Sequence, residues 1–227
     1  MQNNNKEIIL VKDLVRSFVD GECITIVLKN ISFSILEGEF VAIMGRSGAG
    51  KSTTLYQISL LDDPTSGEII LDGINTHDMN QEEKTQFRLN KLGYVFQDYS
   101  LMTDLTALEN VALPLLMQGV DKKEAFLKAE GSLGEVGLSH VMDHVPSSLS
   151  GGEQQRVSIA RAIVHNPKII FADEPTANLD HISSLNVMEI FKNLNKNKGI
   201  TIVMVTHEEE YKKVVDRVIH LDDGKII

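Results

Sequence analysis

Apolar residues in this chain fall into short runs typical of strands and longer stretches with helical spacing. The first three runs are short and closely spaced, with turns at Asp20-Gly21 and Glu37-Gly38, and they predict an antiparallel sheet that leads into the next strand. A later run is almost wholly apolar, as in a parallel strand that is covered on both faces. The expected strands are Ile8–Val15, Ile24–Leu28, Ile31–Ile35, Phe40–Met44, Glu68–Asp72, Leu92–Phe96, Lys168–Ala172, Ile200–Val205 and Arg217–Leu221.

Apolar residues at helical spacing predict helices between these strands. The expected helices are Lys51–Leu61, Gln81–Asn90, Leu105–Leu115 (which Pro114 should kink or end), Lys122–Val136, Glu153–His165 and Ile182–Asn197. Alternating strands and helices predict an α/β fold. We expect a single domain over residues 1–227, in which a core with an N-terminal antiparallel β part occupies about 1–96 and 146–227. An α-helical subdomain should be inserted at about 98–145.

Composition narrows the functional class. The 227 residues are 42% hydrophobic and 24% charged, as in an ordinary globular domain, and carry a net charge of −10. That charge argues against a nucleic-acid binder with a broad basic face. The only cysteine, Cys23, cannot form an internal disulfide, which fits a reducing compartment. We find no signal peptide at the N-terminus and no apolar run near the ~20 residues of a membrane span.

The strand expected at Phe40–Met44 leads into Gly45-Arg-Ser-Gly-Ala-Gly-Lys-Ser-Thr53, which we call the glycine loop. It fits the phosphate-binding pattern G-x-x-x-x-G-K-[ST], in which glycines let successive N–H groups face an anion. A following helix adds its positive dipole end, Lys51 adds a full charge and Ser52 a hydroxyl ligand for magnesium. The alternative is a plain strand-to-helix turn.

Two further segments carry candidate chemistry. Asp173 ends an apolar strand, where it could hold magnesium, and Glu174 follows, where it could polarise an attacking water. An acidic turn after a strand would look the same. Leu149-Ser-Gly-Gly-Glu-Gln-Gln155 is a glycine-bearing turn before a helix, and by itself indicates either an anion site or an unliganded turn.

Together these segments resemble an ATP-binding cassette (ABC) ATPase from about Ile8 to the end of the chain. The motifs that carry the resemblance, in family order and approximate spacing, are Gly45–Thr53, Gln97, Leu149–Gln155, Ile169–Glu174, Asn178–Asp180 and His207. The Leu-Ser-Gly-Gly turn discriminates most, because ordinary phosphate-loop ATPases lack it. The resemblance implies a P-loop NTPase (RecA-like) core, with ATP and Mg²⁺ as ligands and ATP hydrolysis as the activity.

The resemblance also implies roles for individual residues. Lys51 and the loop amides would hold the β- and γ-phosphates, and Thr53 would contact the α-phosphate. Glu174 would act on the attacking water and His207 would contact the γ-phosphate. Magnesium would be held by Ser52, Gln97 and Asp173, with Gln97 also sensing the water. The nucleotide-binding set from the chain's own half is Phe18 (against adenine), Gly45, Arg46, Ser47, Gly48, Ala49, Gly50, Lys51, Ser52 and Thr53. Phe18 could instead be a core residue at a strand end.

In the family, Ser150, Gly151 and Gly152 complete the site of a second nucleotide-binding domain, with Asp180 at the interface. This chain has one such set, so the resemblance implies a head-to-tail pair around two ATP molecules. Leu60–Gly67, Tyr94–Gln97 and Leu105–Pro114 look like the group that serves macrolide-type exporters and lipoprotein-release systems, and peptide-resistance ATPases are similar. Such subunits dock beneath a separate membrane permease, at the cytoplasmic face of the membrane. Gln97 and the following helices would form the docking groove, with no nucleic-acid partner.

Two alternatives remain open, together with some departures from the family. A superfamily ATPase of DNA repair, chromosome organisation or translation would carry a long coiled coil, a zinc-binding insertion or two cassettes, and none is visible here. A nucleotide-sensing scaffold would often lack Glu174.

The departures are Arg46 and Ala49 where proline and serine are usual, Glu153 in place of glutamine, and Glu208 in place of aspartate.

Overall fold

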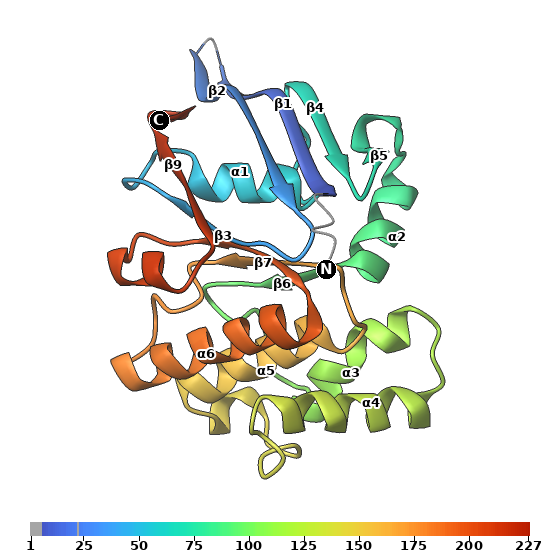
Figure 1. Cartoon of the computed structure of the whole chain (residues 1–227). Helices are drawn as coiled ribbons and strands as arrows, with labels where there is room; N and C mark the ends of the chain where they lie inside the picture. Colours follow the sequence, from blue (N-terminus) through green and yellow to red (C-terminus); the bar gives the residue numbers. More distant parts are fainter. Residues whose placement is uncertain (1–5, 22) are drawn as a thin grey trace.

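Two β-sheets frame the computed structural model, which describes residues 6–21 and 23–227 (Figure 1). Residues 1–5 lie outside the described residues. They make up most of the N-terminal segment in which the sequence shows no signal peptide. The strands are β1 (Glu7–Asp20), β2 (Cys23–Leu36), β3 (Phe40–Met44), β4 (Ser66–Leu71), β5 (Ile74–Asn75), β6 (Leu92–Val95), β7 (Ile169–Asp173), β8 (Thr201–Val205), β9 (Arg217–Asp222) and β10 (Lys225–Ile226). The helices are α1 (Lys51–Ile58), α2 (Gln81–Lys91), α3 (Ala107–Met117), α4 (Lys122–Glu135), α5 (Gly151–Ile163) and α6 (His181–Lys198), with 3₁₀ turns η1 (Thr76–Asp78), η2 (Pro146–Ser148) and η3 (Glu209–Lys213).

The N-terminal strands form the expected antiparallel sheet, in the order β2-β1-β4-β5. The prediction of two separate strands at 24–28 and 31–35 was wrong, because β2 runs through both. Asn30 adopts φ +61° and is skipped in the pairing, since Leu14 faces Ile31 and Val15 faces Lys29. The polar interruption is therefore a β-bulge, which bends a strand without ending it.

The central sheet has the order β10-β9-β3-β8-β7-β6 and is parallel apart from β10. Every residue of β3, β7 and β8 is buried, as expected of parallel strands covered on both faces. Since β8 lies between β3 and β7, the carboxyl ends of β3 and β7 meet at the same edge. That edge brings the glycine loop and Asp173 together.

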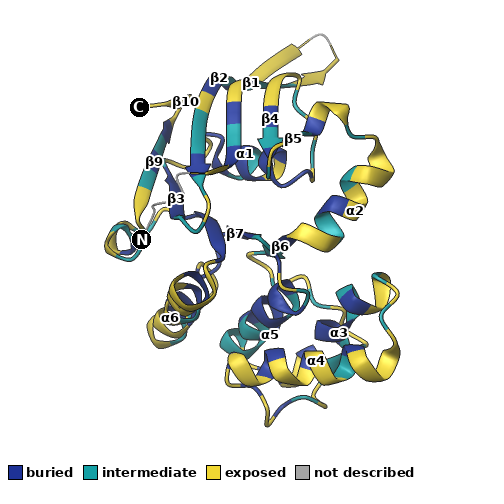
Figure 2. Cartoon of the chain, turned by 45° about the vertical axis from the view of Figure 1, so that its right-hand side comes forward, coloured by how far each residue is buried: buried dark blue, intermediate teal, exposed yellow. Residues whose placement is uncertain are grey.

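The central sheet separates two hydrophobic cores, and β3 shows the division residue by residue. Phe40, Ala42 and Met44 pack into the core toward α5 and α6, whereas Val41 and Ile43 pack into the core toward α1 and the antiparallel sheet. Figure 1 shows α1 between the two sheets and α3, α4, α5 and α6 on the opposite side of the central sheet. Figure 2 shows the central strands buried and the outer helix faces exposed. Because successive side chains of a strand point to opposite faces of the sheet, the central sheet packs against one layer on each face, and the result is a layered α/β fold.

The helical part consists of α3 and α4, which pack on each other and on α5. Thr106 and Glu109 form a capping box at the start of α3, and Gly137 turns the chain after α4 with φ +73°. Pro114 lies inside α3, which continues to Met117, so the proline does not end the helix. Among the described residues, none of the helices is both long and apolar enough to cross a membrane.

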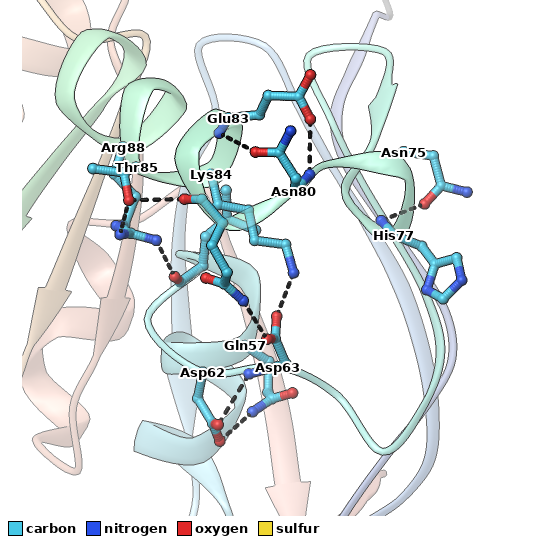
Figure 3. Close-up of polar contacts among 12 residues, drawn as sticks. Gln57, Asp62, Asp63, Asn75, His77, Asn80, Glu83, Lys84, Thr85 and Arg88 are labelled. Atoms are coloured by element: carbon cyan, nitrogen blue, oxygen red, sulfur yellow. Dashed lines mark hydrogen bonds and ion pairs between the residues drawn. The ribbon is translucent and has the colours of Figure 1, made fainter.

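The turn after α1 is tied to α2 by polar side chains (Figure 3). Gln57 donates to Asp62 at 2.7 Å, and Lys84 of α2 pairs with Asp63. Helix α1 ends at Ile58, earlier than the expected Leu61, because Leu60 adopts φ +62° and cannot continue a right-handed helix. These contacts hold the C-terminal end of α1, the helix that begins at the glycine loop.

Candidate functional site

The glycine loop connects β3 to α1 and is held tightly against neighbouring strands. A Cβ on Gly45 would lie 2.1 Å from the carbonyl oxygen of Leu221 in β9, a separation that no side chain allows. A Cβ on Gly50, which precedes α1 with φ +98°, would lie 2.8 Å from a methyl carbon of Leu28 in β2. Only glycine permits both the left-handed turn at residue 50 and this close packing. Between these two packed glycines, residues 46–48 are exposed at the start of a helix, where unpaired N–H groups gather.

A hollow of about 680 Å³ opens in front of this loop. Its lining comes from the loop, from β2 and from the ends of the central strands: Val27, Gly45, Arg46, Ser47, Gly48, Gly50, Lys51, Ser52, Thr53, Glu174 and His207. Lys51 is 7% exposed, and its Nζ donates to the Arg46 carbonyl at 3.1 Å. A buried ammonium held by one neutral acceptor needs an anion to complete its shell. The hollow is suited to phosphate groups.

Ala49 differs from the other loop residues in the expected set. Its side chain is 4% exposed and packs in the core, and it does not line the hollow. Its N–H donates to the Arg46 carbonyl at 3.2 Å, inside the loop. Alanine at this position therefore contributes a small apolar side chain to the core, and the loop amide contributes the hydrogen bond.

Ser52 and Asp173 meet at the base of the site. The Ser52 hydroxyl donates to Asp173 Oδ1 at 3.0 Å. Burial raises the pKa of the Asp173 carboxyl, against the opposing hydrogen bonds from Ser52 and Tyr56. The Ser52 hydroxyl and the Asp173 carboxylate are oxygen ligands of the kind that a hard cation prefers. Such a cation would also stabilise the charged carboxylate, which burial disfavours.

Glu174 and His207 lie next to each other in the wall of the hollow. His207 Nδ1 lies 3.4 Å from Glu174 Oε1, and both residues line the cavity wall. Glu174 adopts φ +42°, an unusual value for a residue with a side chain, and its N–H donates to the Val205 carbonyl at 3.0 Å. This backbone turn lifts the Glu174 carboxylate out of the strand and toward the phosphate site.

Gln97 lines a second hollow, of about 330 Å³, on the far side of Asp173. The lining of that hollow is Tyr56, Phe96, Gln97, Asp98, Ser100, Asp173 and Asn178. The Gln97 carbonyl accepts a hydrogen bond of 3.0 Å from the Asn178 side chain. Asp173 therefore contacts Ser52 on one side and shares a cavity with Gln97 on the other.

The turn at Ser150–Gly152 begins α5 and lies apart from the glycine loop. Ser150 and Glu153 form a capping box, in which the Ser150 hydroxyl donates to the Glu153 carboxylate at 2.6 Å. That bond lowers the pKa of Glu153. A Cβ on Gly152 would lie 2.6 Å from Ser183 Oγ, so the turn packs directly against the start of α6. Neither this turn nor Asp180, which caps α6, lines the hollow in front of Lys51.

Phe18 lies on β1 opposite Thr25 of β2 and is 45% exposed. This exposure excludes the alternative of a core residue. The Arg16 guanidinium sits 4.5 Å from the centre of the Phe18 ring. Phe18 does not line the hollow, so contact with a base stays a prediction.

Val27 and Tyr56 are among the lining residues that were not predicted. Val27 comes from β2, and nothing in its sequence context marks it. Tyr56 shares the hollow of Asp173 and Gln97, and its spacing of four from Ser52 places it on the same face of α1. That spacing could have identified Tyr56.

Comparison with known proteins settles the family. Residues 28–177, more than half of the chain, match the family model described as ABC transporter. The chain belongs to the ABC transporter family. The lipoprotein-releasing system ATP-binding protein LolD of Aquifex aeolicus is 49% identical over 201 residues, which are 88% of this chain and 89% of that protein. The macrolide export ATP-binding/permease protein MacB of Mannheimia succiniciproducens is 46% identical over 97% of this chain, but only 34% of that longer protein is covered.

Solved ABC structures agree with the architecture. The ATP-binding cassette MJ0796, in a structure described as the dimeric post-hydrolysis state bound to ADP and Pi, superposes with a TM-score of 0.90 at 43% identity, covering 96% of each chain. The predicted α/β fold with an antiparallel sheet and the resemblance to the macrolide-exporter and lipoprotein-release group are confirmed. The chain is an ATP-binding ABC subunit, and its activity is ATP hydrolysis.

Proposed function

We propose that two copies of this ABC ATPase close head to tail around two Mg-ATP molecules and drive a separate membrane permease. One observation carries the pairing: Ser150–Gly152 and Asp180 lie outside the hollow that contains Lys51, Glu174 and His207. In an isolated chain, the Ser150 turn is therefore separated from the phosphate hollow. In a two-fold pair, the Ser150 turn of each chain can meet the phosphate hollow of the other chain. The MJ0796 cassette, which is described as dimeric, supports this arrangement.

Each residue of the composite site has a task that follows from its position. Lys51 would exchange the Arg46 carbonyl for phosphate oxygens, and the Ser150 hydroxyl of the second copy would exchange Glu153 for the γ-phosphate. Glu174 would accept a proton as water attacks the γ-phosphorus, and the bond to the bridging oxygen of ADP would break. His207 and Gln97 would orient the water and the phosphate. Ser52 and Asp173, with their oxygens 3.0 Å apart, would hold Mg²⁺, whose charge offsets that of the phosphates.

Mixing two inactive variants tests the shared site. Lys51→Met should disable the phosphate loop and Ser150→Arg the turn that serves the other chain, so each variant alone should be nearly inactive. A mixed pair keeps one intact site, because the unmodified loop of one chain faces the unmodified turn of the other. With random pairing, an equimolar mixture should recover about a quarter of the wild-type hydrolysis rate. A mixture as inactive as its components would contradict the head-to-tail pair.

The docking surface is an apolar hollow of about 410 Å³ between α2, the ends of β6, α3 and α5. Its exposed apolar members include Leu61 and Met117, which are 46% and 65% exposed. Gly93, Phe96 and Pro114 complete its floor, close to Gln97. A short apolar helix from the permease would bury this surface and hold the ATPase at the cytoplasmic face of the membrane. The LolD and MacB relatives are named for lipoprotein release and macrolide export, so we infer a permease that serves lipoprotein release, export or peptide resistance.

Charge placed in this hollow should release the subunit from membranes. Leu61→Glu combined with Met117→Glu should sharply lower the fraction that sediments with membranes of cells that make this chain. Leu127→Glu is a matched control, because Leu127 is 68% exposed on α4 but lies outside the hollow. Equal membrane recovery of the double variant and the control would count against this docking site. Recovery of the wild type only with DNA or ribosomes would favour the alternative superfamily role.

A further inference from the structure

Residues 96–100 form a wall between two cavities. Phe96 and Ser100 line both the apolar hollow near Met117 and the polar hollow that contains Gln97 and Asp173. A change on the apolar side can therefore reach Gln97 through the conformation of this short segment. We call it the partition loop, residues 96–100.

The partition loop has an unusual backbone. Tyr99 and Ser100 both adopt left-handed conformations, with φ +64° and +47°. Two such residues in succession are unfavourable for side chains with a Cβ, so other contacts must hold them. The Ser100 hydroxyl donates to Asp98 Oδ1 at 2.7 Å, and the Asn178 side chain donates to the Gln97 carbonyl.

Arg161 supplies the contacts that reach this strained backbone from outside. It lies on α5, and its guanidinium donates to the Tyr99 carbonyl at 3.0 Å and the Ser100 carbonyl at 2.7 Å. Among the described residues, no carboxylate lies within the 4.0 Å of an ion pair with Arg161. The two terminal nitrogens of the guanidinium group each donate to one of two successive carbonyls. The single ammonium of a lysine cannot reproduce this geometry.

The same loop touches the turn at the other end of α5. The Tyr99 hydroxyl would lie 2.9 Å from a Cβ on Gly151, and it contacts the Asn178 carbonyl at 3.5 Å. Gln155 of α5 also donates to the Phe96 carbonyl at 3.5 Å. Arg161, Gln155 and Gly151 belong to one helix, so α5 contacts the partition loop at three points. Its position is thereby coupled to the Ser150 turn.

We propose that Arg161 is a positioning residue that holds the partition loop, and with it Gln97, in the conformation that ATP hydrolysis requires. Arg161 touches no part of the phosphate hollow, so it acts through the backbone of Tyr99 and Ser100. The inference uses the role proposed above for Gln97. It does not depend on the permease, because it concerns hydrolysis by the chain alone.

The test is the steady-state ATPase activity of the purified chain with Mg²⁺. Arg161→Met should lower kcat about tenfold with the KM for ATP changed less than about twofold, because misplacing a catalytic group weakens the chemical step more than binding. Arg161→Lys, which keeps the charge but can reach only one carbonyl, should fall between Arg161→Met and the wild type. Arg217→Met is the matched control, since this arginine also forks, to Glu39 and the Ser34 carbonyl, far from the loop. It should retain wild-type kcat.

A rescue variant separates positioning from general stability. Glycine adopts the conformation of residue 100 without strain, although it also removes the hydrogen bond from Ser100 to Asp98, so adding Ser100→Gly to Arg161→Met should recover part of the lost kcat. Wild-type kcat in Arg161→Met, or in Arg161→Lys, would overturn the proposal. So would a loss that Ser100→Gly fails to restore even in part, or one in which kcat and ATP affinity fall together with Tm. Failure of membrane docking would leave all of these results unchanged, which separates the two proposals.

Discussion

Replacing Glu174 with glutamine should lower ATP turnover by about 10²- to 10⁴-fold, the range that a positioned general base contributes. The amide cannot accept a proton from the attacking water, whereas its size and its place beside His207 are preserved. ATP binding should persist, because Lys51 and the loop amides are unchanged. The nucleotide that bridges two chains would no longer be consumed, so a dimer should accumulate in size-exclusion chromatography with ATP and Mg²⁺.

Glu208→Gln is the control for this experiment. Glu208 accepts a hydrogen bond of 3.0 Å from Thr176 and lies next to His207 in the chain, but it does not line the phosphate hollow. It should hydrolyse ATP at a rate within a few-fold of the wild type. A Glu174→Gln variant that stays monomeric at saturating Mg-ATP would contradict the pairing mechanism. Equal losses in both variants would instead indicate a general effect of charge.

Replacing Gly45 with alanine should damage both folding and nucleotide binding. The new Cβ would lie 2.1 Å from the Leu221 carbonyl oxygen, and that oxygen belongs to β9, which pairs with β3 in the central sheet. Neither backbone can move without breaking sheet hydrogen bonds, so we expect a loss of about 3 kcal/mol or more in the free energy of unfolding. Thermal denaturation and ATP titration would measure the two effects.

Gly48→Ala offers a comparison within the same loop. Nothing lies within 4 Å of the position of its Cβ, so only the conformation at φ +79° opposes the change. We expect a loss of about 1 kcal/mol. If Gly45→Ala and Gly48→Ala proved equally stable, the close packing of the loop against β9 would be refuted.

Local patterns predicted most of the elements correctly, because they depend on neighbouring residues. The apolar runs that became β3, β7 and β8 are buried on both faces, and such runs signal themselves without tertiary information. The predicted bounds of strands and helices were wrong where the backbone conformation of a single residue departed from what the hydrophobic pattern indicated. Asn30 looked like a break but forms a bulge, and Leu60 looked helical but ends α1.

The site divides in the same way. The glycine loop, Asp173 and Glu174 could be found from sequence because chemistry requires those residue types at fixed spacing beside strands. Val27 and Arg161 could not be found, since each reaches its partners through contacts between segments distant in the chain. Tyr56 is intermediate, because its spacing from Ser52 is visible but its hollow is not.

The sequence by itself determined the phosphate loop, the acidic strand end and the family, because these depend on residue identity and spacing over short segments. The tertiary structure alone decided that Asp173 bonds Ser52 of the phosphate hollow while it lines the hollow of Gln97, that the Ser150 turn stays away from Lys51, and that Arg161 contacts the backbone beside Gln97. The physical reason is that hydrogen bonds and cavity walls join atoms from different elements. Their positions depend on how the sheet orders its strands and on how α5 packs beneath them.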